Sequence, residues 1–298
     1  MSLLLYGDDG TLAGDHPDRS AHSNLCIAFC HGTPLISGNL HIAVSTNGDC
    51  CRHPTLLPYH GIGIGEAFLS GMKFLQQRGP HKQYAQHGTG PARLGQQYDR
   101  YAQMIAESPN PNIKLFISEW NLNSIDWRTG LFAGGFLNMC EARDVVAMGA
   151  AALFIRRTDA PDWNNAFINF DYKDLFKAPN CQVTELWYDH FSKYRLAYSG
   201  ETGNVSVSTT MSENGADVIV KVVNPTDEPA TLRIKGDWEG VSSTGFEYYA
   251  PGSLTVANSM ENKNAVALKK TSASTDGNDV ILSIPALSAG VLTITKAY

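Results

Sequence analysis

Apolar and polar residues follow the clearest pattern in the middle of the chain. The run Ile113-Lys-Leu-Phe-Ile117 has the length and the β-branched or aromatic character of a β-strand. The prolines and asparagines of Ser108-Pro-Asn-Pro-Asn112 predict a turn that ends the preceding helix. Because Glu119 follows shortly after Ile117, we expect it just past the carboxyl end of this strand.

Amphipathic helices are predicted on both sides of this strand. Before it, from Pro91 onward, one helical stripe consists of Leu94, Tyr98, Tyr101, Ala102 and Ile105. After it, Thr129–Arg143 is a second predicted helix. Its Gly134-Gly135 pair costs about 1 kcal/mol per glycine relative to alanine, which is tolerable if another backbone approaches closely there. A third predicted helix, Cys181–Tyr194, has an apolar side of Val183, Leu186, Trp187 and Phe191.

Further strand patterns follow the second helix. The small and apolar run Ala150–Ile155 is expected to be buried on both faces, as strands of parallel sheets are. Beyond Leu196, short alternating runs are separated by turn residues. These runs are Val205–Thr210, Ala216–Val223, Ala230–Ile234, Val280–Ile284 and Val291–Thr295. They predict an antiparallel β-sandwich of about a hundred residues.

The first 88 residues differ in composition from the rest. They hold eight of the nine histidines and four of the six cysteines, but none of the five tryptophans. Periodicity is weak there, with one plausible strand (Ile36–Val44) and one plausible helix (Gly65–Leu75). We therefore expect three regions: residues 1–88, a domain remnant or unrelated sequence; residues 89–195, an α/β region; and residues 196–298, the sandwich.

Composition and charge restrict the partners. The 298 residues are 43% hydrophobic and 17% charged, which is typical of a globular chain with room for two domains. A net charge of −6 without a basic block disfavours nucleic-acid and anionic-membrane partners. No apolar run approaches the roughly 18 residues of a membrane helix. The run Leu3–Tyr6 is too short for the core of a signal peptide, and the location of the protein stays open.

Neither a metal nor another cofactor is predicted. Cys26, Cys30 and His31 are potential zinc ligands, as are the adjacent Cys50 and Cys51. Zinc sites usually repeat a pair of ligands with a short gap, and adjacent cysteines do not repeat it. We therefore expect free or buried thiols at these positions.

Glu119 is the strongest candidate for chemistry. It lies between a predicted buried strand and Trp120. A glycosidase needs a carboxylate in such a place, beside an aromatic ring that can hold a sugar face. The alternative is a surface glutamate in a loop, and spacing alone favours the two interpretations about equally.

Several motifs in order resemble one enzyme family. They are Ile117-Ser-Glu-Trp-Asn121, Asp126-Trp-Arg-Thr-Gly130, Ala166-Phe-Ile-Asn-Phe-Asp171 and Ala178-Pro-Asn180. Together they resemble the C-terminal half of the α-L-arabinofuranosidases, which are retaining glycoside hydrolases with a (β/α)8 barrel followed by a β-sandwich. The resemblance covers roughly Gly90 to Tyr298, and the chain before Gly90 does not carry it.

The resemblance implies a fold class of α/β plus all-β, with a partial (β/α)8 (TIM) barrel followed by an antiparallel β-sandwich. A complete barrel takes about 250 residues, so the barrel is expected to be incomplete. Glu119 would be the nucleophile at the end of the seventh barrel strand. The implied enzyme releases terminal arabinofuranosyl residues from the non-reducing ends of arabinan or arabinoxylan side chains with retention of configuration.

The partner carboxyl group is not recognisable. In the family the acid/base is a glutamate that follows an asparagine on the fourth strand, and this sequence contains no Asn-Glu dipeptide. Glu66 and Glu107 are the only glutamates before Glu119, and Glu107 ends the predicted helix. Glu66 is therefore the candidate acid/base. The alternatives are an inactive truncated relative and a carbohydrate-binding or scaffold module.

Five further residues are candidates for binding a sugar. Trp120 and Asn121 directly follow Glu119, and Arg156 follows the strand Ala150–Ile155. Trp163 and Asn164 lie in the next loop, where an aromatic ring and an amide suit sugar recognition. The expected partner is an arabinose-containing polysaccharide or oligosaccharide, and homo-oligomerisation stays open.

Overall fold

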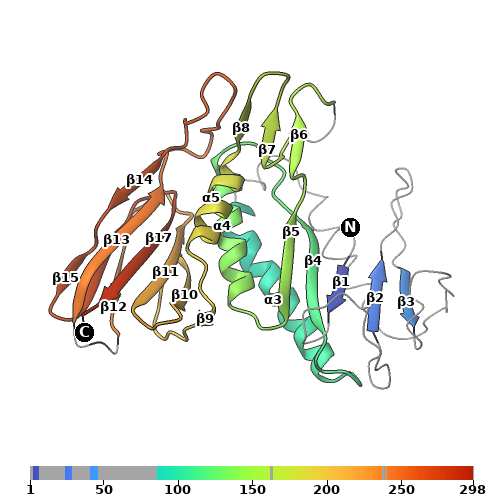
Figure 1. The fold of residues 1–298 in the computed structure, drawn as a ribbon, viewed down its shortest axis with the longest axis horizontal. Helices are drawn as coiled ribbons and strands as arrows, with labels where there is room; N and C mark the ends of the chain where they lie inside the picture. The colour runs from blue at the N-terminus through green and yellow to red at the C-terminus, as the bar shows by residue number, and fades with distance from the viewer. Residues whose placement is uncertain are drawn as a thin grey trace. The chain divides into compact units, whose positions relative to one another are not determined.

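The computed structural model describes residues 3–6, 24–28, 41–45, 86–161, 164–236, 238 and 240–297. This part of the chain is a mixed α/β structure with several antiparallel pairings, in which none of the four sheets closes on itself (Figure 1). Its helices are α3 (Gln86–Ala106), α4 (Trp127–Glu141) and α5 (Pro179–Asp189). The chain divides into two compact units, which we describe separately.

The first unit contains a five-stranded sheet of order β3-β2-β1-β4-β5. Its strands are β1 (Leu3–Tyr6), β2 (Asn24–Ala28), β3 (His41–Ser45), β4 (Lys114–Trp120) and β5 (Val146–Ala151). Strands β4 and β5 are parallel, whereas β1 is antiparallel to β4. Neighbouring strands of a (β/α)8 barrel are all parallel, so among the described strands of this sheet only the β4–β5 pair has the predicted arrangement.

The predicted strand Ala150–Ile155 has the wrong boundaries. The strand that pairs with β4 ends at Ala151, and Phe154 and Ile155 are each 56% exposed. Ile155 instead begins β6 (Ile155–Arg157), which belongs to a separate sheet with β7 (Ile168–Phe170) and β8 (Leu175–Lys177) in the second unit. A short apolar run shows that a strand is near, but the hydrogen-bond register decides where it begins.

The predicted helix before β4 is confirmed. Residues 96–106 of α3 belong to the first unit. Among them Tyr98 is buried, and the other residues of the predicted stripe, Tyr101, Ala102 and Ile105, are half-buried. Arg143 Nε donates to Asp99 Oδ1 and Arg143 Nη2 donates to Asp99 Oδ2, each over 2.9 Å. This ion pair links α3 to the segment that leads into β5.

The second unit contains two antiparallel sheets that share a core. The six-stranded sheet has the order β14-β13-β17-β11-β10-β9, and the three-stranded sheet has the order β12-β16-β15. The first consists of β9 (Tyr194–Arg195), β10 (Ser206–Met211), β11 (Asp217–Asn224), β13 (Val241–Tyr249), β14 (Leu268–Thr271) and β17 (Ser288–Lys296). The second consists of β12 (Ala230–Ile234), β15 (Ser274–Asp276) and β16 (Asp279–Ile284). All five strands predicted after Leu196 are present, whereas β13, β14 and β15 were not predicted.

Strand β11 separates two layers of packing. Val218, Val220 and Val222 join one hydrophobic cluster with residues of the three-stranded sheet, among them Leu282 and Ile284. The alternate residues of β11 point the other way, because successive side chains of a strand face opposite sides. Val223 on that side approaches α4. Both faces of β11 are therefore buried, which explains its nearly continuous apolar sequence.

The glycine pair of α4 lies where other elements approach. A methyl group on Gly134 would lie 2.7 Å from Val223 Cγ2 and 3.2 Å from the Trp187 ring, and one on Gly135 would lie 3.1 Å from Pro91 Cγ. The expected close approach is present, although side chains rather than backbone make it. Helix α4 begins after Asp126, whose carboxylate accepts a hydrogen bond from the Arg128 backbone N–H over 3.2 Å.

Helix α5 is shorter than predicted. It begins at Pro179, in the first helical position that proline favours, and it ends at Asp189 rather than Tyr194. Val183, Leu186 and Trp187 are buried as expected. Phe191 lies beyond the helix and is 70% exposed, so its prediction as a core residue is wrong.

Candidate functional site

Glu119 is the next-to-last residue of β4, inside the strand rather than just past it. The pairing with β5 is irregular at this point. Ile117 pairs with Gly149 and Trp120 with Ala151, so three steps along β4, from 117 to 120, match two along β5, from 149 to 151. This mismatch is a β-bulge, a feature that is common beside active sites because it redirects a side chain.

The bulge changes which face of the sheet Glu119 occupies. Leu115 and Ile117 are buried, and regular alternation would place Glu119 on their side. Instead Trp120 is the next buried residue and Glu119 is only half-buried. Within the part of the chain that the structure describes, the Glu119 carboxylate has no hydrogen bond or ion pair.

Trp120 packs within the first unit. Its side chain is 7% exposed, and a methyl group on Gly149 of β5 would lie 3.4 Å from its indole Nε1. Gly149 thus lies beside the indole, at a distance where even a methyl group would be in ordinary van der Waals contact. Trp120 thus supports the end of β4, and its predicted contact with a sugar stays a prediction.

Asn121 belongs to a group of interlocked amides in the second unit. We use the term amide network for the side chains of Asn121, Asn165 and Asn180 with the Leu122 backbone. The Asn121 side chain accepts from Leu122 N (2.8 Å) and from Asn180 Nδ2 (3.1 Å), and it donates to Asn165 O (2.7 Å). Asn165 Nδ2 in turn donates to Leu122 O over 3.1 Å. The Asn121 amide is thus engaged within the protein.

Arg156 lies inside β6 and not in a loop after a barrel strand. Its guanidinium group donates to the carbonyl of Thr158 over 3.2 Å and to the carbonyl of Ala160. The side chain therefore stabilises the turn that follows β6. The neighbouring Arg157 is exposed, and it pairs with Asp159 at 2.5 Å.

The remaining candidates differ in their placement. Asn164 is exposed, beside the buried Asn165. Trp163 and Glu66 lie outside the described residues, as does the predicted helix Gly65–Leu75. The predicted strand Ile36–Val44 overlaps β3 at His41–Val44.

Other reactive groups are few in the described part of the chain. Burial raises the pKa of the Cys181 thiol to about 11, so this thiol is protonated at neutral pH and is not a nucleophile. In these residues no cluster of three or more histidine, cysteine, aspartate or glutamate side chains is arranged to hold a metal ion. Nor is any helix among them long and apolar enough to cross a membrane.

Two features of the site were not apparent from the sequence. The β-bulge at Glu119 depends on pairing with β5, which lies far along the chain. Asn180 was not singled out as a candidate, although it closes one of the motifs that carried the family resemblance, and Asn165 was noted only as the end of the loop that contains Trp163 and Asn164. A signal was available, because asparagines beside strand and helix ends often bond to backbone groups.

Comparison with solved structures shows similarity to α-L-arabinofuranosidases of glycoside hydrolase family 51. The arabinose complex of the enzyme from Thermotoga maritima matches with a TM-score of 0.61 and 17% identity over 71% of this chain and 50% of that enzyme. The enzyme from Bifidobacterium longum matches with a TM-score of 0.59 and 13% identity over 76% of this chain and 50% of that one. An arabinose-bound family 51 enzyme matches with a TM-score of 0.52 and 20% identity, over 61% of this chain and 28% of its own.

These matches confirm the resemblance at the level of the fold, which is glycoside-hydrolase-like. The chain spans half or less of the length of these three enzymes. No family model matches the sequence, and no curated protein matches it.

Proposed function

We propose that this chain is a retaining glycoside hydrolase of the α-L-arabinofuranosidase type, with Glu119 as its nucleophile. The observation that carries the proposal is the position of Glu119. It lies at the carboxyl end of β4, which is parallel to β5 and antiparallel to β1, and a bulge turns it out of the buried face. Active sites of parallel α/β folds form at this end of the strands. The similarity in fold to family 51 enzymes supports the same assignment.

The proposed architecture follows from the same likeness. In this proposal β4, α4 and β5 are successive elements of an incomplete (β/α)8 barrel within residues 89–195. The two sheets after Leu196 form the β-sandwich of residues 196–298. The parallel β4–β5 pair, with a helix between its strands in the sequence, supports the first statement. The hydrophobic cluster shared by the two antiparallel sheets supports the second.

The proposed chemistry has two steps. A Glu119 oxygen attacks the anomeric carbon, and the bond from that carbon to the leaving oxygen breaks while an acid donates a proton to that oxygen. Water, deprotonated by the same acid/base group, then attacks the anomeric carbon and releases Glu119. Retaining enzymes hold their two carboxyl groups about 5 Å apart, and Glu66 is the proposed acid/base.

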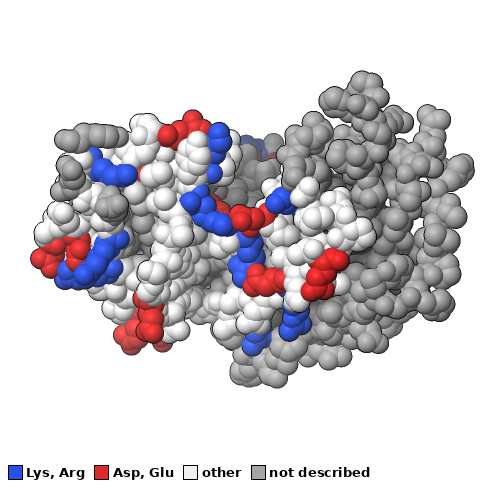
Figure 2. Space-filling view, turned by 90° about the horizontal axis from the view of Figure 1, so that it is seen from below, with Lys and Arg blue, Asp and Glu red and all other residues white. Residues whose placement is uncertain are grey.

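The proposed substrate is an arabinofuranosyl residue at the non-reducing end of arabinan or arabinoxylan. Trp120, Asn121, Arg156, Trp163 and Asn164 remain the proposed substrate-binding residues, although the bonds of Asn121 and Arg156 within the protein favour a supporting role for these two. Basic and acidic side chains are interspersed on the face shown in Figure 2. This mixture agrees with a neutral polar ligand better than with nucleic acid or an anionic membrane.

A second candidate is an inactive relative of such an enzyme. The observation that favours it is the missing Asn-Glu dipeptide, which carries the acid/base in the resembled family. Loss of general acid–base assistance typically costs a factor of 10² to 10⁴ in rate, and the cost is greatest for poor leaving groups such as a sugar oxygen. A carbohydrate-binding module would retain affinity without any turnover.

Hydrolysis assays on the purified chain distinguish these candidates. We expect slow turnover of an aryl α-L-arabinofuranoside, whose leaving group barely needs the proton, and its loss in Glu119→Gln. On arabinan, whose leaving oxygen needs the proton, we expect little or no turnover unless Glu66 serves as the acid. A rate on arabinan near the ordinary enzymatic value of about 10 s⁻¹ would show that a second carboxylate is in place. Glu66→Gln would then be the variant that identifies it. Arabinan binding without turnover of either substrate would favour the binding module.

A further inference from the structure

The long loop between β13 and β14 holds the beginning of α5. Asn258 in this loop donates to the Lys177 carbonyl over 2.8 Å and to Gln182 Oε1 over 3.0 Å. Gln182 Nε2 donates back to Val266 O over 3.1 Å, and Val266 N donates to Asn258 Oδ1 over 2.9 Å. These reciprocal bonds fix the loop to the end of β8 and to the first turn of α5.

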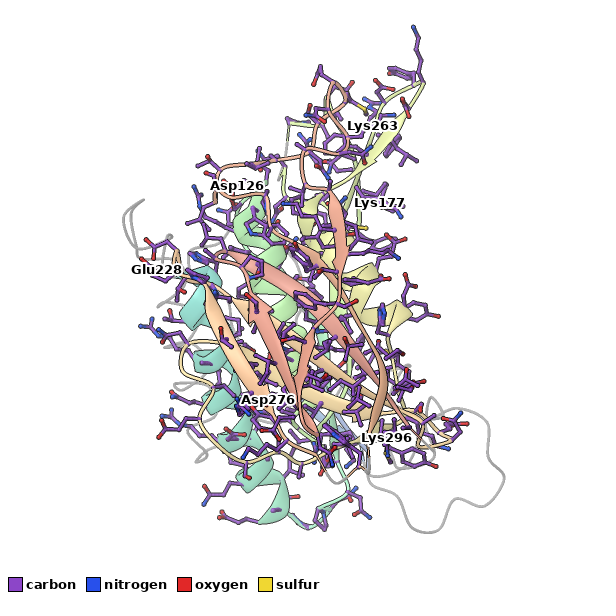
Figure 3. All side chains as sticks on the ribbon, turned by 90° about the vertical axis from the view of Figure 1, so that its left-hand side faces the viewer. Asp126, Lys177, Glu228, Lys263, Asp276 and Lys296 are labelled. Atoms are coloured by element: carbon purple, nitrogen blue, oxygen red, sulfur yellow. The ribbon has the colours of Figure 1, made fainter. Side chains whose placement is uncertain are left out.

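An ion pair also holds the loop between β13 and β14 to the hairpin formed by β7 and β8. Lys263 of the loop pairs with Asp174 of the β7–β8 hairpin. Figure 3 shows Lys263 and Lys177 near one another, at the opposite end of the second unit from Asp276 and Lys296. In Figure 1 the loop lies beside β8. The loop that joins β13 and β14 of the six-stranded sheet thus stabilises the first turn of α5.

Asn180 transmits this support to the amide network. Its side chain is 1% exposed, and it occupies the second position of α5. Its Nδ2 donates to Asn121 Oδ1 over 3.1 Å and lies 3.4 Å from Asn165 O. Its Oδ1 accepts from the Cys181 backbone N–H over 2.9 Å, which fixes the orientation of the amide.

Asn121 is joined by a single peptide bond to Trp120, the last residue of β4. A bond that fixes Asn121 therefore restrains the backbone two residues beyond Glu119. Small displacements of a reacting group are costly, since a misplacement of about 1 Å can lower a rate about 10²-fold.

We propose that Asn180 is a positioning residue that holds the exit of β4 through Asn121 and so orients Glu119. This inference rests on the proposed function of Glu119. The residue is not expected to touch the substrate, because both of its amide atoms are engaged within the protein. Its loss should lower kcat and leave KM nearly unchanged.

A double-mutant cycle on the full chain tests this role with an aryl α-L-arabinofuranoside. We expect Asn180→Ala and Asn121→Ala each to lower kcat by about 10- to 100-fold, with the KM of Asn180→Ala within about twofold of the parent value. If Asn180 acts through Asn121, the double variant should be no slower than the slower single variant. The matched control is Asn169→Ala, because Asn169 is 4% exposed and its Nδ2 bonds, within the described residues, to Ala166 O alone, at 3.2 Å. This variant should leave kcat unchanged.

Hydrogen exchange provides a readout that needs no activity. Asn180→Ala should speed exchange of the backbone amides of residues 118–124 in the absence of substrate, and Asn169→Ala should not. Unchanged exchange, additive losses in the cycle, or an unaffected kcat would each overturn the positioning role. Turnover that survives in Glu119→Gln would overturn the function proposed for Glu119 and, with it, the catalytic part of this inference. Faster exchange of residues 118–124 in Asn180→Ala would still show that the amide network restrains the end of β4, even if Glu119 is not the nucleophile.

Discussion

Lys221 on β11 forms an ion pair with Glu141 at the end of α4. The Lys221 side chain is 1% exposed, whereas that of Glu141 is 23% exposed. Ser208 Oγ donates to the second carboxylate oxygen of Glu141 over 2.5 Å. The ammonium group is thus buried between helix and sheet, and its charge is balanced by a carboxylate that still reaches water.

This asymmetry predicts unequal costs for removing the two charges. Glu141→Gln leaves a buried ammonium group without its counter-charge, which should lower the free energy of unfolding by about 3–5 kcal/mol. Lys221→Met should cost less than half as much, because Glu141 keeps Ser208 and its contact with water. Urea unfolding followed by circular dichroism measures both. Lys193→Met is the control, because its ion pair with Glu213 is exposed and should contribute less than about 1 kcal/mol. Equal losses of unfolding free energy in Glu141→Gln and Lys193→Met would show that the Lys221–Glu141 ion pair contributes no more than an exposed one.

Gly134→Ala tests the packing of α4. Alanine gains about 1 kcal/mol of helix propensity over glycine, but the new methyl group would lie 2.7 Å from Val223 Cγ2. Overpacking typically costs about 1–3 kcal/mol, so we expect net destabilisation. A melting curve should show a lower Tm for this variant. Gly245→Ala on β13 is the comparison, since no atom lies within 4 Å of the added methyl group. A higher Tm for Gly134→Ala would show that the helix is not closely packed there.

The ion pair between Asp174 and Lys263 predicts an acid-sensitive loop. The hydrogen bond from Lys263, followed by that from the Leu175 backbone, lowers the pKa of Asp174 below its ordinary value of 3.8. The folded state therefore favours the ionised carboxylate. Its stabilising effect is fully present above the ordinary pKa and is lost as the pH falls through the lowered one.

We accordingly expect Asp174→Asn to have a lower Tm than the parent chain at pH 7, and the difference to shrink and vanish as the pH falls through the lowered pKa of Asp174. Lys263→Met should behave in the same way, and combining the two changes should add little. A Tm difference that does not depend on pH would rule out the ion pair as its source.

The sequence predicted the elements better than it predicted their pairing. The apolar stripe of α3, the buried side of α5 and the strands at Ala230–Ile234 and Val291–Thr295 follow from local periodicity. Strand β13 was not predicted, because its first residues Val241-Ser-Ser-Thr-Gly245 carry little apolar alternation. It is stabilised by pairing with β17, and no local pattern reports such a contact.

At the candidate site, too, local patterns were informative about single residues but not about contacts between distant segments. Glu119 was singled out from the strand and motif around it, and it lies inside the end of β4 rather than just past it, while its role as nucleophile stays a prediction. Its release from the buried face depends on the register with β5, which a local pattern does not contain. The role of Asn180 likewise depends on Asn121, 59 residues away in the sequence.

If Glu119 is the nucleophile, it becomes covalently bound to the sugar during turnover. The measurement is the mass of tryptic peptides after incubation with a 2-fluorinated aryl α-L-arabinofuranoside, because the fluorine slows release of a glycosyl-enzyme intermediate. Cleavage after Lys114 and Arg128 yields the peptide Leu115–Arg128, in which Glu119 is the only glutamate. Glu107→Gln is the matched control, since this exposed carboxylate bonds to Gln103 on α3. We predict that the sugar mass appears on this peptide in the parent chain and in Glu107→Gln, and is absent in Glu119→Gln. A label on another peptide, a label that persists in Glu119→Gln, or no label on the parent chain would show that Glu119 is not the nucleophile.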